Sequence, residues 1–235
     1  YADLGANMKP ETAVNMGEPL NNERNSALTA ISPDGQRALL LNKYLPDGKM
    51  EVGVSIAQRG PNGWEMPVPL EIDSFYNDSQ YGEYFLNSNG RVMIMTLQRK
   101  DSEGDKDLYY TEVRADGSWT EPKSMGPVIN TAAGETSPFL AADDRTLYFS
   151  TEGLPGYGKK DMFVTRRVGE GWTEWTTPEN LGPVLNTPGW DAYYSIPASG
   201  EYVYFVSYKD GGFGAADIYR TKLPKALRPN PVVLV

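Results

Sequence analysis

Three acidic residues hold related positions in this sequence and are the first candidates for chemistry. Glu135 and Asp191 each stand five residues after an asparagine, Asn130 and Asn186, and Glu83 lies near the corresponding position of an earlier segment. A pair of carboxyl groups, one protonated and one ionised, is what glycoside hydrolysis requires. The other interpretation is that these carboxylates accept backbone N–H groups and join neighbouring segments of the chain. Both interpretations stay open at this point.

Aromatic residues gather around the same positions. Tyr81, Trp190 and Tyr193 are close in sequence to the three acids. Aromatic rings beside polar groups suit stacking on a glycan or a hot spot for a protein partner, although they equally suit ordinary packing. The three acids and these three aromatics together form the candidate binding site.

The composition excludes most other kinds of catalytic site. The chain contains no histidine and no cysteine, so it has no Ser-His-Asp or Cys-His arrangement, and a zinc site would depend on carboxylates alone. We therefore expect no catalytic residues, no metal site and no cofactor. With 31 acidic against 22 basic residues the net charge is −9, which repels nucleic acid, and no apolar run is long enough to span a membrane.

A second set of acids recurs once per repeat, always beside a turn. One interpretation is a ring of metal-binding carboxylates, and the other is a set of turn acids whose oxygens accept backbone N–H groups. A single copy per repeat favours the structural role, so we expect these acids to stabilise turns. The four acids are Glu51, Asp107, Asp161 and Asp217, at steps of 56, 54 and 56 residues.

Several other landmarks share this period. The second residue of a central turn recurs at steps of 55, 54 and 56 residues, and a tryptophan corner and a closing asparagine recur with it. A period of about 55 residues with four short strands per unit is typical of a propeller. The landmarks are Gly35, Gly90, Asp144 and Gly200 in the turns, Trp64, Trp119 and Trp172 at the corners, and Asn21, Asn77, Asn130 and Asn186 at the closings.

The segment from Asn130 to Asn186 shows the unit most clearly. Its apolar runs Pro138–Leu140, Leu147–Ser150 and Met162–Thr165 are bounded by turn formers, as strands are. The second strands of the repeats are apolar without alternation, which indicates that both their faces are covered. The sequence thus predicts an all-β fold, a β-propeller of four-stranded antiparallel blades with four complete repeats and a partial N-terminal one.

We expect a single propeller domain over residues 1–235. It comprises a partial blade (1–21) and repeats 22–77, 78–130, 131–186 and 187–235. Tyr1 falls inside a third strand of the repeat, so we expect preceding residues that complete a further blade, within a larger multidomain protein. The first strands of a propeller line its central channel, so the candidate binding residues are expected at the channel mouth.

The phrase Ser32-Pro33-Asp34-Gly35, the run from Asp144 to Ser150 and the tripeptide Asp217-Ile218-Tyr219 resemble WD40-like propeller repeats of the TolB type. With the Gly-Trp corners and the Leu-Gly-Pro-Val-Leu-Asn closing, the chain is most similar to the propeller of OmpA-family lipoproteins from Bacteroidetes-type bacteria. This resemblance implies a periplasmic protein, associated with the outer membrane, that acts by binding. The peptidoglycan-binding domain of that family has no counterpart among these residues.

Two functions follow as expectations. The first is a non-enzymatic interaction platform in the bacterial envelope, with other envelope proteins or a glycan as partners. The alternative is a carbohydrate-active hydrolase or glycan-binding propeller that uses the acidic channel mouth at Glu83, Glu135 and Asp191. The absence of histidine and the incomplete repetition of these acids favour the first.

Overall fold

The computed structural model describes residues 2–3, 5, 10–21, 27–32, 34–197, 200–209 and 211–232. The chain forms two compact units, Tyr1–Leu70 and Glu71–Val235. Both consist of antiparallel β-sheet, and the described ranges contain one 3₁₀ helix, η1 (Lys225–Leu227), but no α-helix. Within these ranges, no helix has the length and apolar character needed to cross a membrane.

The first unit contains one sheet. Its strands run in the order β1-β2-β3-β4, and β5 also pairs with β3. The buried side of the sheet packs around Leu40 and Ala57, and the segment before β1 closes this core through Leu20, whose carbonyl accepts the Tyr44 hydroxyl at 3.0 Å. The strands are β1 (Leu28–Ile31), β2 (Arg37–Tyr44), β3 (Met50–Gly60), β4 (Gly63–Trp64) and β5 (Val68–Pro69).

The segment before β1 also carries the closing turn of a blade. The Asn15 side-chain oxygen accepts the Gly17 N–H at 2.7 Å and the Asn21 side-chain amide at 2.8 Å. The third repeat ends with the same pair of bonds, in which Asn180 accepts from Gly182 and Asn186. The interpretation of residues 1–21 as a partial blade stays a prediction.

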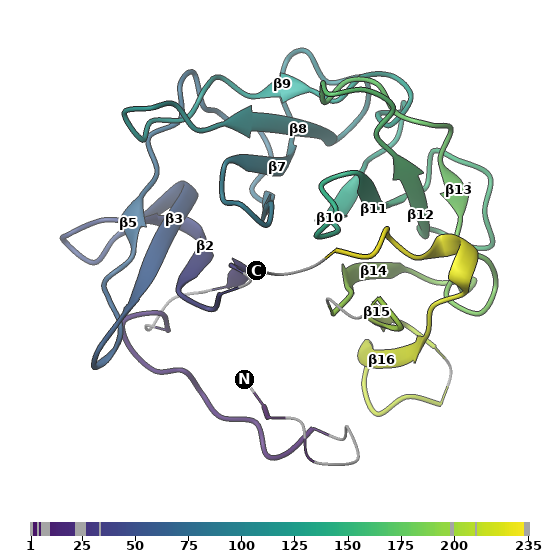
Figure 1. Cartoon of the computed structure of the whole chain (residues 1–235), viewed down its shortest axis with the longest axis horizontal. Coiled ribbons are helices and arrows are strands. Elements are labelled where there is room, and N and C mark those ends of the chain that lie inside the picture. The colour runs from purple at the N-terminus through teal and green to yellow at the C-terminus, as the bar shows by residue number, and fades with distance from the viewer. Residues whose placement is uncertain are drawn as a thin grey trace. The chain divides into compact units, whose positions relative to one another are not determined.

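The second unit contains three sheets, each made of consecutive strands. The first has the order β6-β7-β8-β9, the second β10-β11-β12-β13 and the third β14-β15-β16. Figure 1 shows the three sheets following one another, with β9 and β13 on the outside. Consecutive antiparallel sheets of this kind are propeller blades, so the predicted fold class is confirmed. The strands are β6 (Glu83–Leu86), β7 (Val92–Leu97), β8 (Asp107–Glu112), β9 (Lys123–Ser124), β10 (Thr136–Leu140), β11 (Thr146–Thr151), β12 (Asp161–Arg166), β13 (Glu179–Asn180), β14 (Asp191–Ser195), β15 (Tyr202–Ser207) and β16 (Asp217–Lys222).

The second strands explain how the blades are held together. Every residue of β7 and β11 is buried, as their unbroken apolar sequence predicts. One apolar cluster joins the first two sheets of this unit around Ile94 and Phe149, and another joins the second and third around Tyr148 and Phe205. In β15 burial alternates instead, because within this unit only one face of the third sheet is covered by another sheet.

The fourth strands are shorter than the sequence predicts. The first sheet of the second unit has only the two-residue β9 as its fourth strand, and Trp119 is held by isolated bridges to Ile72 and Val113. Pro122 stands between them and has no N–H to donate, so the chain leaves the ladder there. The third sheet has no fourth strand among the described residues of this unit.

The exit segment, residues 223–232 in the described structure, packs across two blades and forms no strand over these residues. The Tyr148 hydroxyl donates to the Leu227 carbonyl at 2.6 Å, and Leu227 is buried. Arg166 donates to the carbonyls of Ala226 and Arg228 at 3.1 and 3.2 Å.

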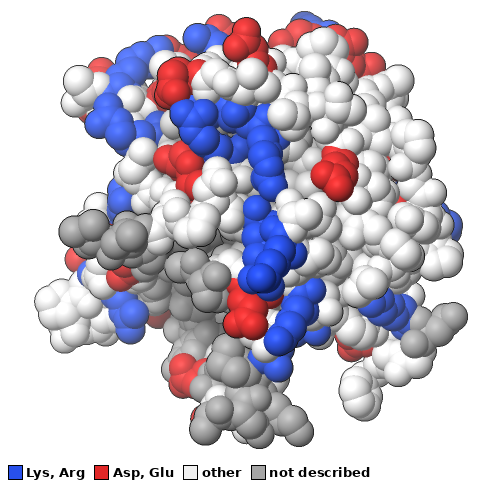
Figure 2. All heavy atoms as spheres, turned by 45° about the vertical axis from the view of Figure 1, so that its right-hand side comes forward, with Lys and Arg blue, Asp and Glu red and all other residues white. Residues whose placement is uncertain are grey.

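Figure 2 shows that Lys and Arg side chains form a stripe on the face turned to the viewer, although the chain is acidic as a whole.

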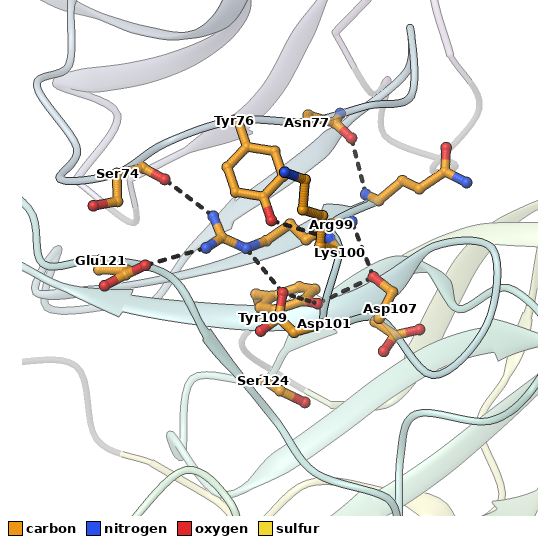
Figure 3. Close-up of polar contacts among 12 residues, drawn as sticks. Ser74, Tyr76, Asn77, Arg99, Lys100, Asp101, Asp107, Tyr109, Glu121 and Ser124 are labelled. Carbon is orange, nitrogen blue, oxygen red and sulfur yellow. Dashed lines mark hydrogen bonds and ion pairs between the residues drawn. The ribbon is translucent and has the colours of Figure 1, made fainter.

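A buried arginine fastens the segment before β6 to the sheet of β6 to β9. The side chain of Arg99 is 5% exposed and lies between the rings of Tyr76 and Tyr109, 4.2 and 5.6 Å from their centroids. Its guanidinium donates to the Ser74 carbonyl at 3.1 Å and to Glu121 at 3.2 Å (Figure 3). We call this arrangement the Arg99 clamp.

Candidate functional site

The inner strands of the second unit bring the candidate residues together. β10 contacts both β6 and β14, the first strands of the neighbouring blades. Figure 1 shows β10 and β14 on the inner side of their sheets, opposite the outer strand β13. The starts of these three inner strands therefore lie close together, although the strands are far apart in sequence.

Glu83 is where the three inner strands converge. It is the first residue of β6, is partly buried, and its carboxylate accepts the backbone N–H of Ser137 from β10. The same carboxylate accepts the hydroxyl of Tyr193 from β14. One carboxyl group is thus bound by residues of two other blades, and we call Glu83, Ser137 and Tyr193 the inner-strand site.

Two bulges give Ser137 and Tyr193 their positions. The pairing register shifts between Thr136 and Phe139 in β10 and between Ala192 and Ser195 in β14. Ser137 and Tyr193 lie in these shifts with φ angles of 54° and 57°, the left-handed region that non-glycine residues seldom adopt. Such backbone strain clusters at functional positions, where it aims a group that a regular strand would point elsewhere.

A buried lysine lies beside the site. Lys160 is 5% exposed, and its ammonium donates to the Gly134 carbonyl at 2.9 Å and the Thr136 hydroxyl at 3.3 Å. The same nitrogen lies 5.4 Å from the centre of the Trp190 ring. Lys160 and Glu83 interact electrostatically, so the site pairs an amine with a carboxyl group, which carry opposite charges when both are ionised.

Burial shifts the proton affinity of these groups in opposite directions. Loss of solvent raises the pKa of Glu83, against the opposing effects of the Ser137 N–H and of nearby lysines. Loss of solvent lowers the pKa of Lys160. The charge of Glu83, followed by burial, raises the pKa of Tyr193 to about 12, so its hydroxyl stays a donor. A carboxyl group with raised pKa next to hydroxyl donors is suited to giving a proton to a bound ligand.

Glu135 and Asp191 are placed differently from Glu83. Both are fully buried. Glu135 accepts the backbone N–H and the hydroxyl of Thr131 at 3.0 and 2.7 Å, and the Thr151 hydroxyl at 2.7 Å. Asp191 accepts the backbone N–H and the hydroxyl of Thr187 at 2.6 and 2.9 Å. These bonds close the turns that lead into β10 and β14, so neither carboxylate faces solvent.

The predicted aromatic residues remain accessible. Tyr193 is 60% exposed apart from its bond to Glu83, and Trp190 is 46% exposed beside Lys160. Tyr81 is 69% exposed, in the segment that leads into β6, and its backbone N–H donates to Ser79. The structure therefore joins Glu83, Tyr193 and Trp190 through direct contacts or through Lys160, and it gives Tyr81 no contact with that group.

Sequence analysis missed three residues around Glu83. The Ser137 N–H donates to the Glu83 carboxylate, and Lys160 interacts with it electrostatically. Thr96 is the partner of Glu83 across the β6–β7 ladder. The hydroxyls of Ser137 and Thr96 are buried without a hydrogen-bond partner in the described structure, which is expected where a ligand or water belongs. Lys160 had a sequence signal, because it precedes the turn acid Asp161 as Lys106 precedes Asp107.

Three of the turn acids, Asp107, Asp161 and Asp217, begin the third strands β8, β12 and β16, and each binds the hairpin loop that precedes it. Asp107 accepts N–H groups of Glu103 and Gly104 at 2.8 and 3.3 Å, and Asp217 accepts those of Phe213 and Gly214 at 2.8 and 3.3 Å. Asp161 accepts the N–H groups of Tyr157 and Gly158 at 2.5 and 3.0 Å, whereas Glu51 is exposed opposite Lys43. Among the described residues no group of acids is arranged to hold a metal ion.

No protein-family model and no curated protein sequence matches the chain. Similar solved structures include TolB from Acinetobacter baumannii, 16% identical over 83% of this chain and 42% of that one, with a TM-score of 0.48. The periplasmic gluconolactonase of Pseudomonas aeruginosa is 16% identical over 94% and 63%, with a TM-score of 0.49. A puromycin hydrolase is 10% identical over 93% and 33%, with a TM-score of 0.49. The chain thus spans less than two thirds of each of these proteins.

The comparisons correct one expectation. We expected a protein that is not an enzyme, but the similar structures include a gluconolactonase and a puromycin hydrolase beside TolB. A propeller of this kind therefore gives no ground for excluding catalysis, and the non-enzyme expectation is withdrawn. The resemblance to TolB-type propellers agrees with these structures, whereas no family model supports the OmpA-family resemblance. At such identities and TM-scores the likeness assigns no ligand or reaction.

Proposed function

We propose that the inner-strand site binds a carbohydrate-type ligand, and that Glu83 serves as proton donor to it. The observation that carries this proposal is the convergence of three blades on one partly buried carboxyl group with a raised pKa. A protonated Glu83 gives a sugar hydroxyl or ring oxygen one donor, and the Tyr193 hydroxyl oxygen can accept a hydrogen bond from a sugar hydroxyl. The exposed ring of Tyr193 supplies apolar surface of the kind that packs on a sugar face.

Hydrolysis of a sugar lactone is the reaction that this chemistry would serve, because glycoside hydrolysis requires a second carboxyl group and the inner-strand site has only Glu83. Glu83 would protonate the leaving ring oxygen as its bond to the carbonyl carbon breaks, while water adds its hydroxyl to that carbon and returns its remaining proton to the Glu83 carboxylate. The buried ammonium of Lys160 would stabilise the Glu83 carboxylate that forms when Glu83 gives up its proton. Glu135 and Asp191 take no part, because their oxygens lie in closed turns.

We place this function in the bacterial periplasm, in a protein associated with the outer membrane and with other envelope proteins. The sequence resemblance to TolB-type and OmpA-family propellers supports this location. The net charge of −9 disfavours nucleic acid as a partner.

The test combines binding and turnover. The protein is screened by calorimetry and by product analysis against neutral sugars, sugar lactones and aryl glycosides. We expect Glu83→Gln to keep most binding, because glutamine can accept the Ser137 N–H, but to abolish turnover. Asp191→Asn serves as a control outside the site, with its folding checked by circular dichroism. Turnover that is unchanged in Glu83→Gln would contradict the role of Glu83, and no binding of any sugar would contradict the site.

A further inference from the structure

Exposed aromatic side chains continue outward from the inner-strand site. Trp190 is 46%, Tyr208 53% and Tyr157 53% exposed, all in loops at the end of the blades where β14 begins. Isolated aromatics on a surface need no explanation, but a contiguous set beside a buried polar group indicates a binding surface. We call Tyr157, Trp190 and Tyr208 the aromatic rim.

Contacts between loops make the rim continuous. The loop of Tyr157 packs on the segment before Trp190, because a Cβ added to Gly158 would lie 2.1 Å from the Thr187 carbonyl, and the Lys159 N–H donates to the Gly189 carbonyl at 3.1 Å. On the other side, a Cβ on Gly189 would lie 3.4 Å from the Cβ of Tyr208. Backbone at such close approach fixes the loops relative to one another.

The rim is connected to the inner-strand site through Lys160. Lys160 lies 5.4 Å from the ring centre of Trp190 and also interacts with Glu83. The lysine covers one face of the indole, so the half-exposed ring offers its remaining surface to a ligand.

From this arrangement we propose that the ligand is an oligosaccharide chain and not a single sugar. One sugar unit occupies the inner-strand site, and the following units lie along the aromatic rim, with Trp190 as the stacking residue next to the first unit. A neutral, linear, β-linked chain fits, because its rings present flat C–H faces to aromatic rings and it carries no charge to be repelled by an acidic protein. This inference rests on the proposed function and adds the class of substrate.

Calorimetry with cello- and chito-oligosaccharides, from mono- to hexasaccharide, tests the inference. We expect affinity to rise with chain length in the unchanged protein. Trp190→Ala should weaken binding of the hexasaccharide about tenfold, the loss of one stacking contact, and leave the monosaccharide within about twofold. Phe213→Ala is the matched control, because Phe213 is fully exposed in the β15–β16 loop outside the rim and should change neither.

The outcomes separate this inference from the proposed function. Monosaccharide binding or turnover that depends on Glu83 but not on chain length would leave the inner-strand site intact and overturn the rim. Equal weakening of mono- and hexasaccharide by Trp190→Ala, with an unchanged melting temperature, would also overturn it. Failure of every saccharide to bind would overturn both. Trp190→Phe should regain the rise of affinity with chain length that Trp190→Ala loses, because phenylalanine also offers a ring on which a sugar can stack.

Discussion

The Arg99 clamp gives the sharpest prediction for stability. We consider Arg99→Ala, which removes a guanidinium that is 5% exposed and held between Tyr76 and Tyr109. The change leaves the Ser74 carbonyl without its donor and empties the space between two rings. Glu121 and Asp101 also lose a partner, but both are more than half exposed and regain water.

The magnitude follows from these contacts. The two cation–π contacts contribute about 1 kcal/mol, and the hydrogen bond to the Ser74 carbonyl about 1 kcal/mol. Lost packing of the buried side chain adds about 1 kcal/mol, and the exposed ion pairs add little. We therefore expect Arg99→Ala to lower the free energy of unfolding by about 3 kcal/mol. Arg99→Lys keeps the charge but cannot reproduce the planar fork, so about half of that loss remains.

Urea denaturation followed by tryptophan fluorescence measures the effect, with the slope compared between variants to confirm that the same surface unfolds. Arg145→Ala is the control. Its ion pair with Glu170 joins side chains that are 42% and 86% exposed and should cost at most about 1 kcal/mol. If Arg99→Ala lowers the free energy of unfolding no more than this control does, the clamp does not fasten the segment before β6 as described. The same follows if Arg99→Lys is as stable as the unchanged protein.

Three further predictions concern the site and its supports. Because burial raises the pKa of Glu83, the folded state keeps a proton that the unfolded state releases, so the free energy of unfolding falls as pH rises from the ordinary value of 4.5 through the raised one. Glu83→Gln should remove this part of the pH dependence, measured by urea midpoints between about pH 4 and about pH 8, and identical profiles would contradict the shift. Asp161→Ala should cost about 1–3 kcal/mol in thermal unfolding, because two backbone N–H groups lose their acceptor, and an unchanged melting temperature would argue against a capping role. Gly158→Ala should destabilise the same hairpin, since its Cβ would meet the Thr187 carbonyl, whereas Gly171→Ala has open space and is the control.

The repeat made the blades predictable, because each landmark is a local requirement of one unit. Turns, corners and apolar second strands all follow from residues close in sequence, and β7 and β11 appear where their apolar runs predict them. Burial in β15 was less predictable, because it depends on how many sheets pack against that blade and not on the apolar sequence of the strand itself.

The site was only partly predictable for a related reason. Glu83 was found because an acid near a strand start is visible in sequence, but its partners Ser137 and Tyr193 reach it through bulges that no composition signal marks. Glu135 and Asp191 look like Glu83 in sequence, but each has a threonine four residues earlier, which its carboxylate binds, where Glu83 has Ser79.

The exit segment has a mechanical consequence. It crosses from β16 onto the neighbouring blade, where Tyr148, Arg166 and Asp143 hold the backbone between residues 226 and 230. A pulling force applied at residue 230 would therefore load the interior strands β11 and β12 before it reached β16. Several bonds spread over four residues would resist that load together, whereas an edge strand pulled from its end would detach one bond at a time. The third repeat thus acts as the anchor of this end of the chain under tension.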